Sequence, residues 1–393
     1  MSVNFIHYKL NQKNVTGNLR VLELGNNISA PLIGQILADL GLDVIKVEPP
    51  NGDDRRNVKP EVNGISLYFA STNRGKRSVV INLKTTEGYN IINKLIRTSD
   101  VIITNYRPSA LKRLRVDYES VKKINDRIIY CSITGFGNFS AEADRPAYDA
   151  TILALSGLLD MTGDENGPPA KFATSIADIT TALLGAISVL WALNKGGPAF
   201  IDVPMIYTQF YLTLEDAYMF LNAGVIPKRT GSSHRYLVPY QAFKTTDGYI
   251  YLAVFNDEQY NRLCKALNRD DLLKFNIISK RLENKAFIVS ELQKIFQNNN
   301  NEYWINFLSK IDVPVAPVLN LGEAFEKYGK NLTYERNGIK YINFPVNSDK
   351  LNVGRKSYAP KLGQHTKEVL LELGYDENDI EDLAKRGIVY KEG

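Results

Sequence analysis

Short apolar runs alternate with segments of helical periodicity over the first half of the chain. Residues 20–24 (RVLEL) and 43–48 (DVIKVE) are short and rich in Val, Leu and Ile, which is typical of buried strands. Between them, residues 30–40 carry apolar side chains at helical spacing. Similar strand-like runs follow at residues 79–83, 100–104, 128–133 and 200–203. This repeated order of strand, helix and strand predicts an α/β fold with a parallel sheet.

The pattern changes in the second half of the chain. Residues 207–221 predict a helix that leaves the first domain, and residues 224–233, with their Gly, Pro and Arg, are typical of a linker. Residues 243–248 predict a hairpin turn before a strand at 249–254, and residues 258–267 predict a helix. These elements indicate a second, smaller α/β domain.

A long helix is predicted directly after Asp178. Apolar side chains recur at helical spacing over residues 179–193. An Asp at this position is a favoured helix N-cap, because its oxygen accepts a bond from a free N–H group. The positive end of the helix dipole also keeps a nearby carboxylate ionised, and an ionised, partly buried carboxylate can act as a nucleophile. Both interpretations are open from the residues alone.

Composition and charge indicate a soluble globular protein with more than one domain. The 393 residues exceed the about 100 to 200 of a usual single domain. Hydrophobic residues make up 44% and charged residues 23%, an ordinary mixture. The net charge of +5 comes from interspersed basic and acidic residues, so no nucleic-acid surface is predicted, although a small positive excess suits a polyanionic cofactor.

The two cysteines and the N-terminal residues indicate the cellular compartment and whether a metal is bound. Cys131 and Cys264 have no C-x-x-C partner, so we predict buried thiols and no zinc or redox motif. The first residues, MSVNFIHYKLNQKN, lack the apolar region of a signal peptide, and no apolar run of about 18 residues is evident. We therefore expect a cytoplasmic protein with no metal cofactor.

The first strand, helix and strand also suggest a dinucleotide site, with Glu48 about 20 residues beyond the first turn. The loop GNNISAPLIG does not have the G-x-G-x-x-G spacing, and no G-x-x-x-x-G-K-[ST] loop occurs. A nicotinamide dehydrogenase and a P-loop ATPase are therefore disfavoured.

Polar residues follow several of the predicted strands. Lys84 comes after one strand, and Asn105, Tyr106 and Arg107 come after another, with Arg113 one to two helical turns further on. Ligands of open parallel sheets bind at the carboxyl ends of the strands, so these side chains lie where a ligand is expected. Solvated strand-end residues are the alternative for any one of them.

Several motifs resemble the family III CoA-transferases, also called the CaiB/BaiF family. They include Ala30-Pro31, residues 37–41 (LADLG), residues 44–49 (VIKVEP), Tyr148-Asp149 and Ala177-Asp178 opening a helix. Further matches lie at residues 313–318, 359–366 and 373–375. The family contains formyl-CoA:oxalate transferases, carnitine CoA-transferases and alpha-methylacyl-CoA racemases. The resemblance covers nearly the whole chain. One departure is Ile28, where formyl-CoA transferases have Gln, so oxalate specificity is not expected.

The resemblance implies a reaction and a set of site residues. Asp178 would attack an acyl-CoA thioester, forming a mixed anhydride and then an aspartyl-CoA thioester from which an acceptor acid takes the CoA. Tyr148 would contact the substrate, and His234 has either that role or a surface role. The implied contacts with coenzyme A are Asn82, Leu83, Lys84, Asn105, Tyr106, Arg107, Arg113 and Arg145.

The resemblance also implies a domain arrangement and an assembly. A large Rossmann-like parallel-sheet domain would begin with residues 1–223. Residues 224–330 would form a linker and the small α/β domain, and residues 331–393 a return linker and the C-terminal part of the large domain. Two chains would thread through each other as an interlocked homodimer.

Two other functions compete with CoA transfer. Racemisation next to the thioester needs a base and an acid on opposite faces, and in the racemases a His stands at the position of Tyr148. The histidines of this chain are His7, His234 and His365, and Asn256 stands near the position of a racemase Glu. A non-catalytic CoA-binding protein would not need Asp178. The transferase is therefore favoured over both.

Overall fold

A computed structural model describes residues 19–349, 353–354 and 356–390. The predictions about the signal peptide and His7 concern residues outside these ranges. The chain forms two compact units. The first comprises Met1–Ser156, Ala173–Tyr218 and Leu332–Gly393, and the second comprises Gly157–Phe172 and Met219–Asn331. The second unit thus includes residues 157–172, which the sequence reading placed with the large domain.

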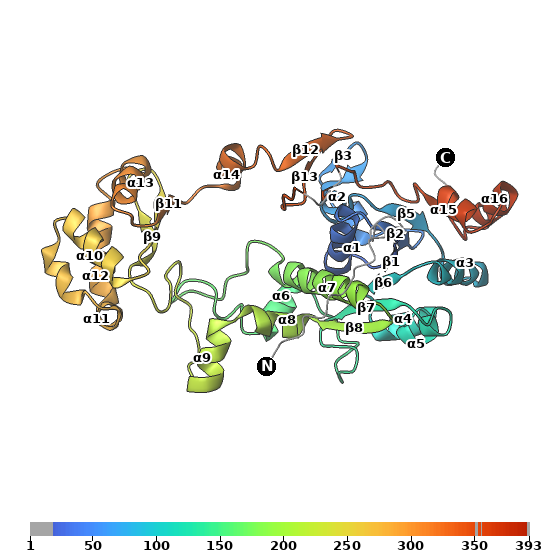
Figure 1. Cartoon of the computed structure of the whole chain (residues 1–393), viewed down its shortest axis with the longest axis horizontal. Helices are drawn as coiled ribbons and strands as arrows, with labels where there is room; N and C mark the ends of the chain where they lie inside the picture. Colours follow the sequence, from blue (N-terminus) through green and yellow to red (C-terminus); the bar gives the residue numbers. More distant parts are fainter. Residues whose placement is uncertain (1–18, 350–352, 355, 391–393) are drawn as a thin grey trace, which may run out of the picture. The chain divides into compact units, whose positions relative to one another are not determined.

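The first unit is built on a six-stranded parallel sheet in the order β5-β2-β1-β6-β7-β8 (Figure 1). Its strands are β1 (Arg20–Leu24), β2 (Asp43–Glu48), β5 (Arg77–Val80), β6 (Val101–Thr104), β7 (Ile129–Thr134) and β8 (Ala199–Pro204). This confirms the predicted parallel sheet. Continuous buried runs of Val, Leu and Ile are typical of parallel strands, because both faces of such a sheet are covered. The chain winds outward from β1 in both directions, so a crevice is expected at the carboxyl ends of β1 and β6.

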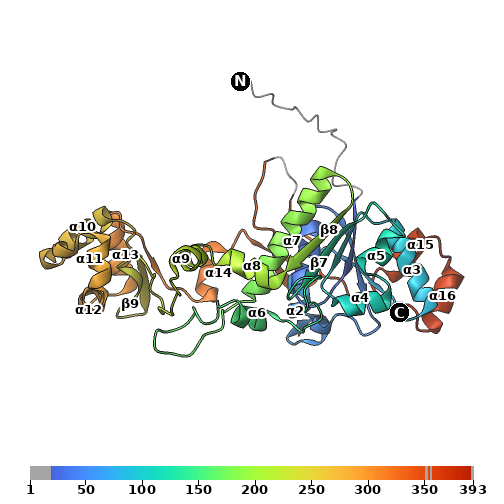
Figure 2. The ribbon, with the colours of Figure 1, turned by 90° about the horizontal axis from the view of Figure 1, so that it is seen from below.

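Helices cover both faces of this sheet, with α7 on one side and α3, α4 and α5 on the other (Figure 2). The first layer contains α1 (Ser29–Asp39), α2 (Leu67–Asn73), α6 (Asp149–Leu155), α7 (Ile176–Lys195) and α8 (Met205–Leu212). The second contains α3 (Thr86–Arg97), α4 (Pro108–Leu114), α5 (Tyr118–Lys122), α15 (Thr366–Glu372) and α16 (Glu377–Lys385). Gly185 lets α1 and α7 approach closely, since a Cβ there would lie 2.5 Å from Cδ1 of Ile33. Short elements complete the unit: η1 (Asp54–Asn57), β3 (Glu61–Val62), β4 (Ile65–Ser66), β12 (Thr333–Arg336) and β13 (Ile339–Ile342).

The second unit has its own hydrophobic core around a three-stranded antiparallel sheet, β11-β10-β9. Its elements include β9 (Tyr240–Lys244), β10 (Tyr249–Ala253), β11 (Val315–Pro317), α10 (Asp257–Ala266), η2 (Asp270–Phe275), α11 (Ile278–Glu283), α12 (Lys285–Phe296), α13 (Asn301–Lys310) and α14 (Leu321–Tyr328). The predicted hairpin between β9 and β10 is confirmed, and Cys264 is buried, as is Cys131 in the first unit.

One segment was predicted to form a single continuous helix, and this prediction is wrong. The segment expected at residues 207–221 forms two helices, α8 and α9 (Glu215–Ala223). Leu214 between them has a φ of 36°, in the left-handed region that an α-helix cannot include. Apolar periodicity continues through the break, so the pattern alone did not reveal it.

The outward face of α7 is apolar. The helix is long and apolar enough by composition to cross a membrane, and one of its faces packs against α1, α8, β7 and β8 in the first unit. Ile187 and Trp191 are 61% and 60% exposed, and Leu183 is 48% exposed. Within the described part of the chain, this stripe is left open to solvent.

Candidate active site

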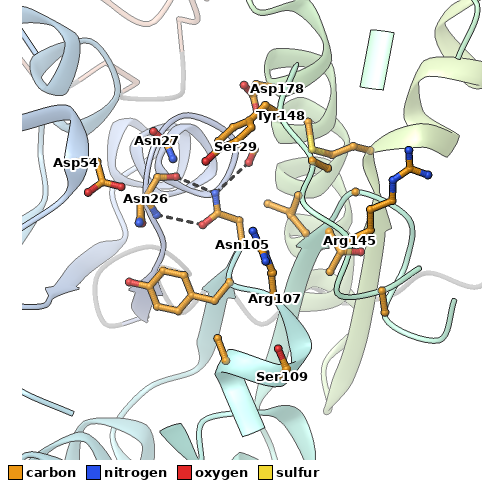
Figure 3. A pocket seen from close by; sticks show the side chains of 18 of the residues that line it. Asn26, Asn27, Ser29, Asp54, Asn105, Arg107, Ser109, Arg145, Tyr148 and Asp178 are labelled. Carbon is orange, nitrogen blue, oxygen red and sulfur yellow. Dashed lines mark hydrogen bonds between the residues drawn. The ribbon is translucent and has the colours of Figure 1, made fainter. Parts of the chain in front are cut away.

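A cavity of about 460 Å³ opens at the carboxyl ends of the central strands, entirely within the first unit (Figure 3). It is lined by residues from the loop after β1, the loop after β6, the segment before α6 and the start of α7. Seven residues named from the sequence come together here: Asn105, Tyr106, Arg107, Arg113, Arg145, Tyr148 and Asp178.

Asn105 ties two loops of the cavity together. Its side-chain Nδ2 donates to the carbonyl of Asn26 at 2.8 Å and to Oγ of Ser29 at 3.2 Å, while the backbone N–H of Asn26 donates to Oδ1 at 3.1 Å. Gly25 permits this approach, because a Cβ there would lie 2.9 Å from Asn105 Oδ1. Asn105 therefore shapes the cavity wall, and its side-chain amide is already occupied.

Asp178 occupies the first turn of α7, so the alternative interpretation of this residue as the helix N-cap is wrong. The helix begins at Ile176, with Ser175 in the N-cap position. Asp149, from the start of α6, accepts hydrogen bonds from the backbone N–H groups of Ala177 at 2.8 Å and Asp178 at 3.4 Å. The free N–H groups are thus satisfied from another helix, which leaves the Asp178 carboxylate available to the cavity.

The electrostatic setting of Asp178 favours a reactive carboxylate. Burial raises its pKa to about 6, and the negative charge of Asp149 adds to the rise, whereas Arg55 and a hydrogen bond with Ser29 oppose it. With this pKa the group is about nine-tenths ionised at pH 7, and it is more basic than an ordinary aspartate.

Ser29 and Arg55 were not identified from the sequence, and Asp149 was named only as part of a motif. Each acts on Asp178 from a different element: Ser29 from α1, Arg55 from η1 and Asp149 from α6. No local sequence signal connects positions so far apart in the chain. Asp149 is buried, and its second oxygen, Oδ2, has no hydrogen-bond partner among the described residues.

A group of buried lysine and carboxylate side chains lies next to the loops that line the cavity. Nζ of Lys46 lies 2.9 Å from Oε1 of Glu23 and 2.9 Å from Oδ2 of Asp53, and donates to the carbonyl of Gly25 at 2.7 Å. Nζ of Lys76 lies 2.7 Å from the other oxygen of Glu23. The carboxylates raise the pKa of Lys46 despite its burial, whereas burial lowers that of Lys76 to about 8.

Asp53 connects this buried group to the cavity wall. Its Oδ1 accepts from the backbone N–H groups of Arg55 at 3.0 Å and Asn27 at 3.4 Å. Asn27 lines the cavity and has a φ of 63°, a left-handed conformation that Asn tolerates better than most residues. The buried charges therefore hold the backbone of Asn27 and Arg55 in place.

The arginines of the cavity differ in their surroundings. Arg145 pairs with Glu142 and lies over the ring of Phe136, with 5.0 Å from the guanidinium carbon to the ring centroid. Arg107 is the N-cap residue of α4 and Arg113 lies in its last turn, and neither forms an ion pair among the described residues. These two cations are available to an anionic ligand at the edge of the sheet.

Four of the named residues do not line this cavity. Asn82, Leu83 and Lys84 follow β5, where Oδ1 of Asn82 accepts from the backbone N–H of Lys84 at 3.2 Å. His234 belongs to the second unit, where its Nδ1 accepts from the backbone N–H of Tyr236 and its ring stacks on Tyr240. Among the described residues no cluster of three His, Cys, Asp or Glu side chains could hold a metal ion.

Comparisons with known proteins agree with an active site in this cavity. The model of CoA-transferase family III matches residues 17–366. Succinyl-CoA:glutarate CoA-transferase of Mus musculus is 35% identical, over 94% of this chain and 89% of that protein. Succinate--glutarate CoA-transferase of Agrobacterium fabrum is 33% identical, over 92% and 96% respectively. The crystal structure of a CaiB/BaiF family protein from Brucella suis superposes with a TM-score of 0.83 and 33% identity, covering 91% of this chain and 99% of that one.

Proposed function

The chain belongs to CoA-transferase family III, and from that premise we propose that it moves CoA between an acyl-CoA thioester and a free carboxylic acid through Asp178. The observation that carries the proposal is the placement of this carboxylate. It lies in a cavity at the carboxyl ends of the sheet, with a raised pKa and with arginines lining the same cavity.

The reaction has two symmetrical halves. A carboxylate oxygen of Asp178 attacks the thioester carbonyl, the C–S bond breaks, and a mixed anhydride and a CoA thiolate result. The thiolate then attacks the aspartyl carbonyl, which releases the donor acid and leaves an aspartyl-CoA thioester. An acceptor carboxylate attacks that thioester and displaces the thiolate. The thiolate finally attacks the acyl carbon of the new anhydride, which forms the product thioester and regenerates Asp178. No net proton transfer is required.

CoA would lie along the strand ends. Arg107 and Arg113 are exposed cations at that edge, suited to phosphate groups, and Arg145 lines the same cavity. Asn82, Leu83 and Lys84 follow β5, whose carboxyl end belongs to the same edge of the sheet, and we keep them as proposed contacts. Tyr148 and His234 remain proposed contacts for the acid substrate.

Short dicarboxylic acids are the proposed substrates. The two relatives above are named for reactions of succinyl-CoA or succinate with glutarate. Three arginines line the cavity, and Arg55 carries a further positive charge close to Asp178, so the site suits dianionic acids.

Covalent trapping on Asp178 tests the proposed function. Wild-type protein incubated with succinyl-CoA and then with hydroxylamine should yield a peptide with a hydroxamate at Asp178, detected by mass spectrometry. Asp178→Ala should give none. The transferase would be refuted if no adduct forms and solvent deuterium instead enters the α-carbon of a 2-methylacyl-CoA, the result expected of a racemase.

The rate of adduct formation should depend on the ionisation of Asp178. Only the carboxylate attacks, so the single-turnover rate should fall about tenfold per pH unit below a midpoint near 6. In Asp149→Asn a like charge is removed while Oδ1 still accepts from Ala177, so the midpoint should move to lower pH. It should stay above the ordinary 3.8, because burial remains. An identical midpoint in both proteins would show that Asp149 does not act on Asp178.

We further propose that the chain forms the interlocked homodimer that its family resemblance implies. Besides the exposed apolar stripe of α7, the neighbouring helix α8 exposes Tyr207 and Tyr211, by 62% and 68%. Apolar surface of this extent is typical of a protein interface. Light scattering after gel filtration should give twice the mass of one chain, and Ile187→Glu with Trp191→Glu should reduce it to one chain. A monomeric wild type would refute the proposal.

A further inference from the structure

Arg55 is a cation held beside the cavity by contacts that leave part of its guanidinium free. Nη1 donates to the carbonyl of Asn27 and to Oγ1 of Thr72, each at 3.3 Å. The guanidinium also lies over the ring of Tyr68, at 5.3 Å from the centroid. Among the described residues, Nε and Nη2 have no hydrogen-bond partner. Arg55 therefore keeps donors for a ligand.

The position of Arg55 relative to Asp178 is informative. The two charges act on each other's ionisation, yet no ion pair joins them among the described residues. Arg55 is bonded to the carbonyl of Asn27, and Asp178 is hydrogen-bonded to Ser29, two residues further along the same segment. A chain of two or three methylene groups spans roughly 4 to 5 Å between its carboxyl carbons. A second carboxylate on an acyl group bound at Asp178 would lie that far from the acyl carbon.

The other cations of the cavity lie in a different direction. In Figure 3, Asn27 and Asp54 lie on one side of Asp178 and Arg145 on the other, with Arg107 near the end of β6. Arg55 follows Asp54 in η1 and is bonded to Asn27, so it belongs to the first side. The exposed carboxylate of Asp54 on that side would repel a second negative charge, which leaves Arg55 as the group able to attract one.

We propose that Arg55 binds the remote carboxylate of a dicarboxylic acyl group attached at Asp178, and so selects dicarboxylic over monocarboxylic substrates. Nε and Nη2 together present the planar fork that matches a carboxylate in two parallel hydrogen bonds. Arg55 is half-buried, and a hydrogen bond shielded in part from water is electrostatically stronger than one in bulk water. The inference rests on the proposed transfer through Asp178 and adds the residue that recognises the remote carboxylate of the acid.

The experiment compares two thioesters that differ only at the remote end. Succinyl-CoA and butyryl-CoA have the same chain length, with a carboxylate in one where the other has a methyl group. Single-turnover rates of adduct formation at Asp178 are measured for both with wild type, Arg55→Met, Arg55→Lys and Arg113→Met. Thermal melting of each protein confirms folding.

Wild type should prefer succinyl-CoA, and Arg55→Met should lose that preference by on the order of 10- to 100-fold, because only the succinyl rate falls. Arg55→Lys should lose part of it, since the charge remains without the fork. Arg113→Met should slow both thioesters alike. An unchanged ratio in Arg55→Met, or an equal loss of both rates, would overturn the role of Arg55 while leaving transfer through Asp178 intact. No adduct from either thioester in wild type would overturn the proposed function and this inference with it. Should Arg55→Met fail to fold, the ratio in Arg55→Lys decides.

Discussion

Asp178→Asn should reduce CoA transfer by on the order of 10⁴-fold or more, as expected when the nucleophile of a covalent mechanism is lost. The amide has nearly the same shape as the carboxylate, so the cavity should keep its form. It has no anionic oxygen to attack a thioester. Steady-state transfer from succinyl-CoA to glutarate, followed by chromatography of the CoA esters, measures the loss.

The same variant should be more stable than wild type at neutral pH. Because the folded pKa of Asp178 is about 6 against 3.8 for an ordinary aspartate, wild type loses stability as pH rises from 3.8 to 6. Asn has no charge to bury beside Asp149, so Asp178→Asn should gain about 1 to 3 kcal/mol at pH 7. Below pH 3.8 this difference should vanish. Urea unfolding at both pH values measures it, and a destabilised variant at pH 7 would argue that the carboxylate is structural rather than reactive.

Lys46→Met should destabilise the first unit by about 3 to 5 kcal/mol, the usual cost of removing one partner from a buried ion pair. Met matches the length of Lys, but it leaves the negative charges of Glu23 and Asp53 buried with less positive charge beside them. Asp53 also positions the backbone of Asn27 and Arg55, so the protein that still folds should form the Asp178 adduct more slowly. Urea unfolding and single-turnover trapping follow the two effects.

A second buried pair provides a matched control. Arg74 pairs with Asp39, the last residue of α1, whereas the cavity contains Ser29, the first residue of that helix. Arg74→Met should also destabilise the protein, yet it should leave the trapping rate of the folded fraction near that of wild type. If both variants slow trapping equally, the effect of Lys46 is general loosening rather than support of the cavity loops.

The sequence was most informative where structure is local. Residues 20–24 and 43–48 were predicted with their observed bounds, because a buried parallel strand requires a continuous apolar run. Asn105, Arg107 and Asp178 were expected at one edge of the sheet, since parallel strands end together there.

The parts that escaped prediction depend on contacts between distant segments. The start of α7 is set by Asp149, 29 residues before Asp178. Arg55 is placed by Asp53, which is itself held by Lys46 in the interior of a strand. A charged residue inside an apolar strand is a visible signal of a buried pair, but the sequence does not identify its partner. The break at Leu214 likewise has no signature in apolar periodicity.

Helix α7 carries Asp178 in its first turn and the apolar stripe of Leu183, Ile187 and Trp191 along its outward face. A second copy of the chain that covers this stripe, as proposed above, would also restrain the helix whose first turn holds Asp178. Specific activity is then expected to rise with protein concentration until the dimer dominates, and to fall on dilution.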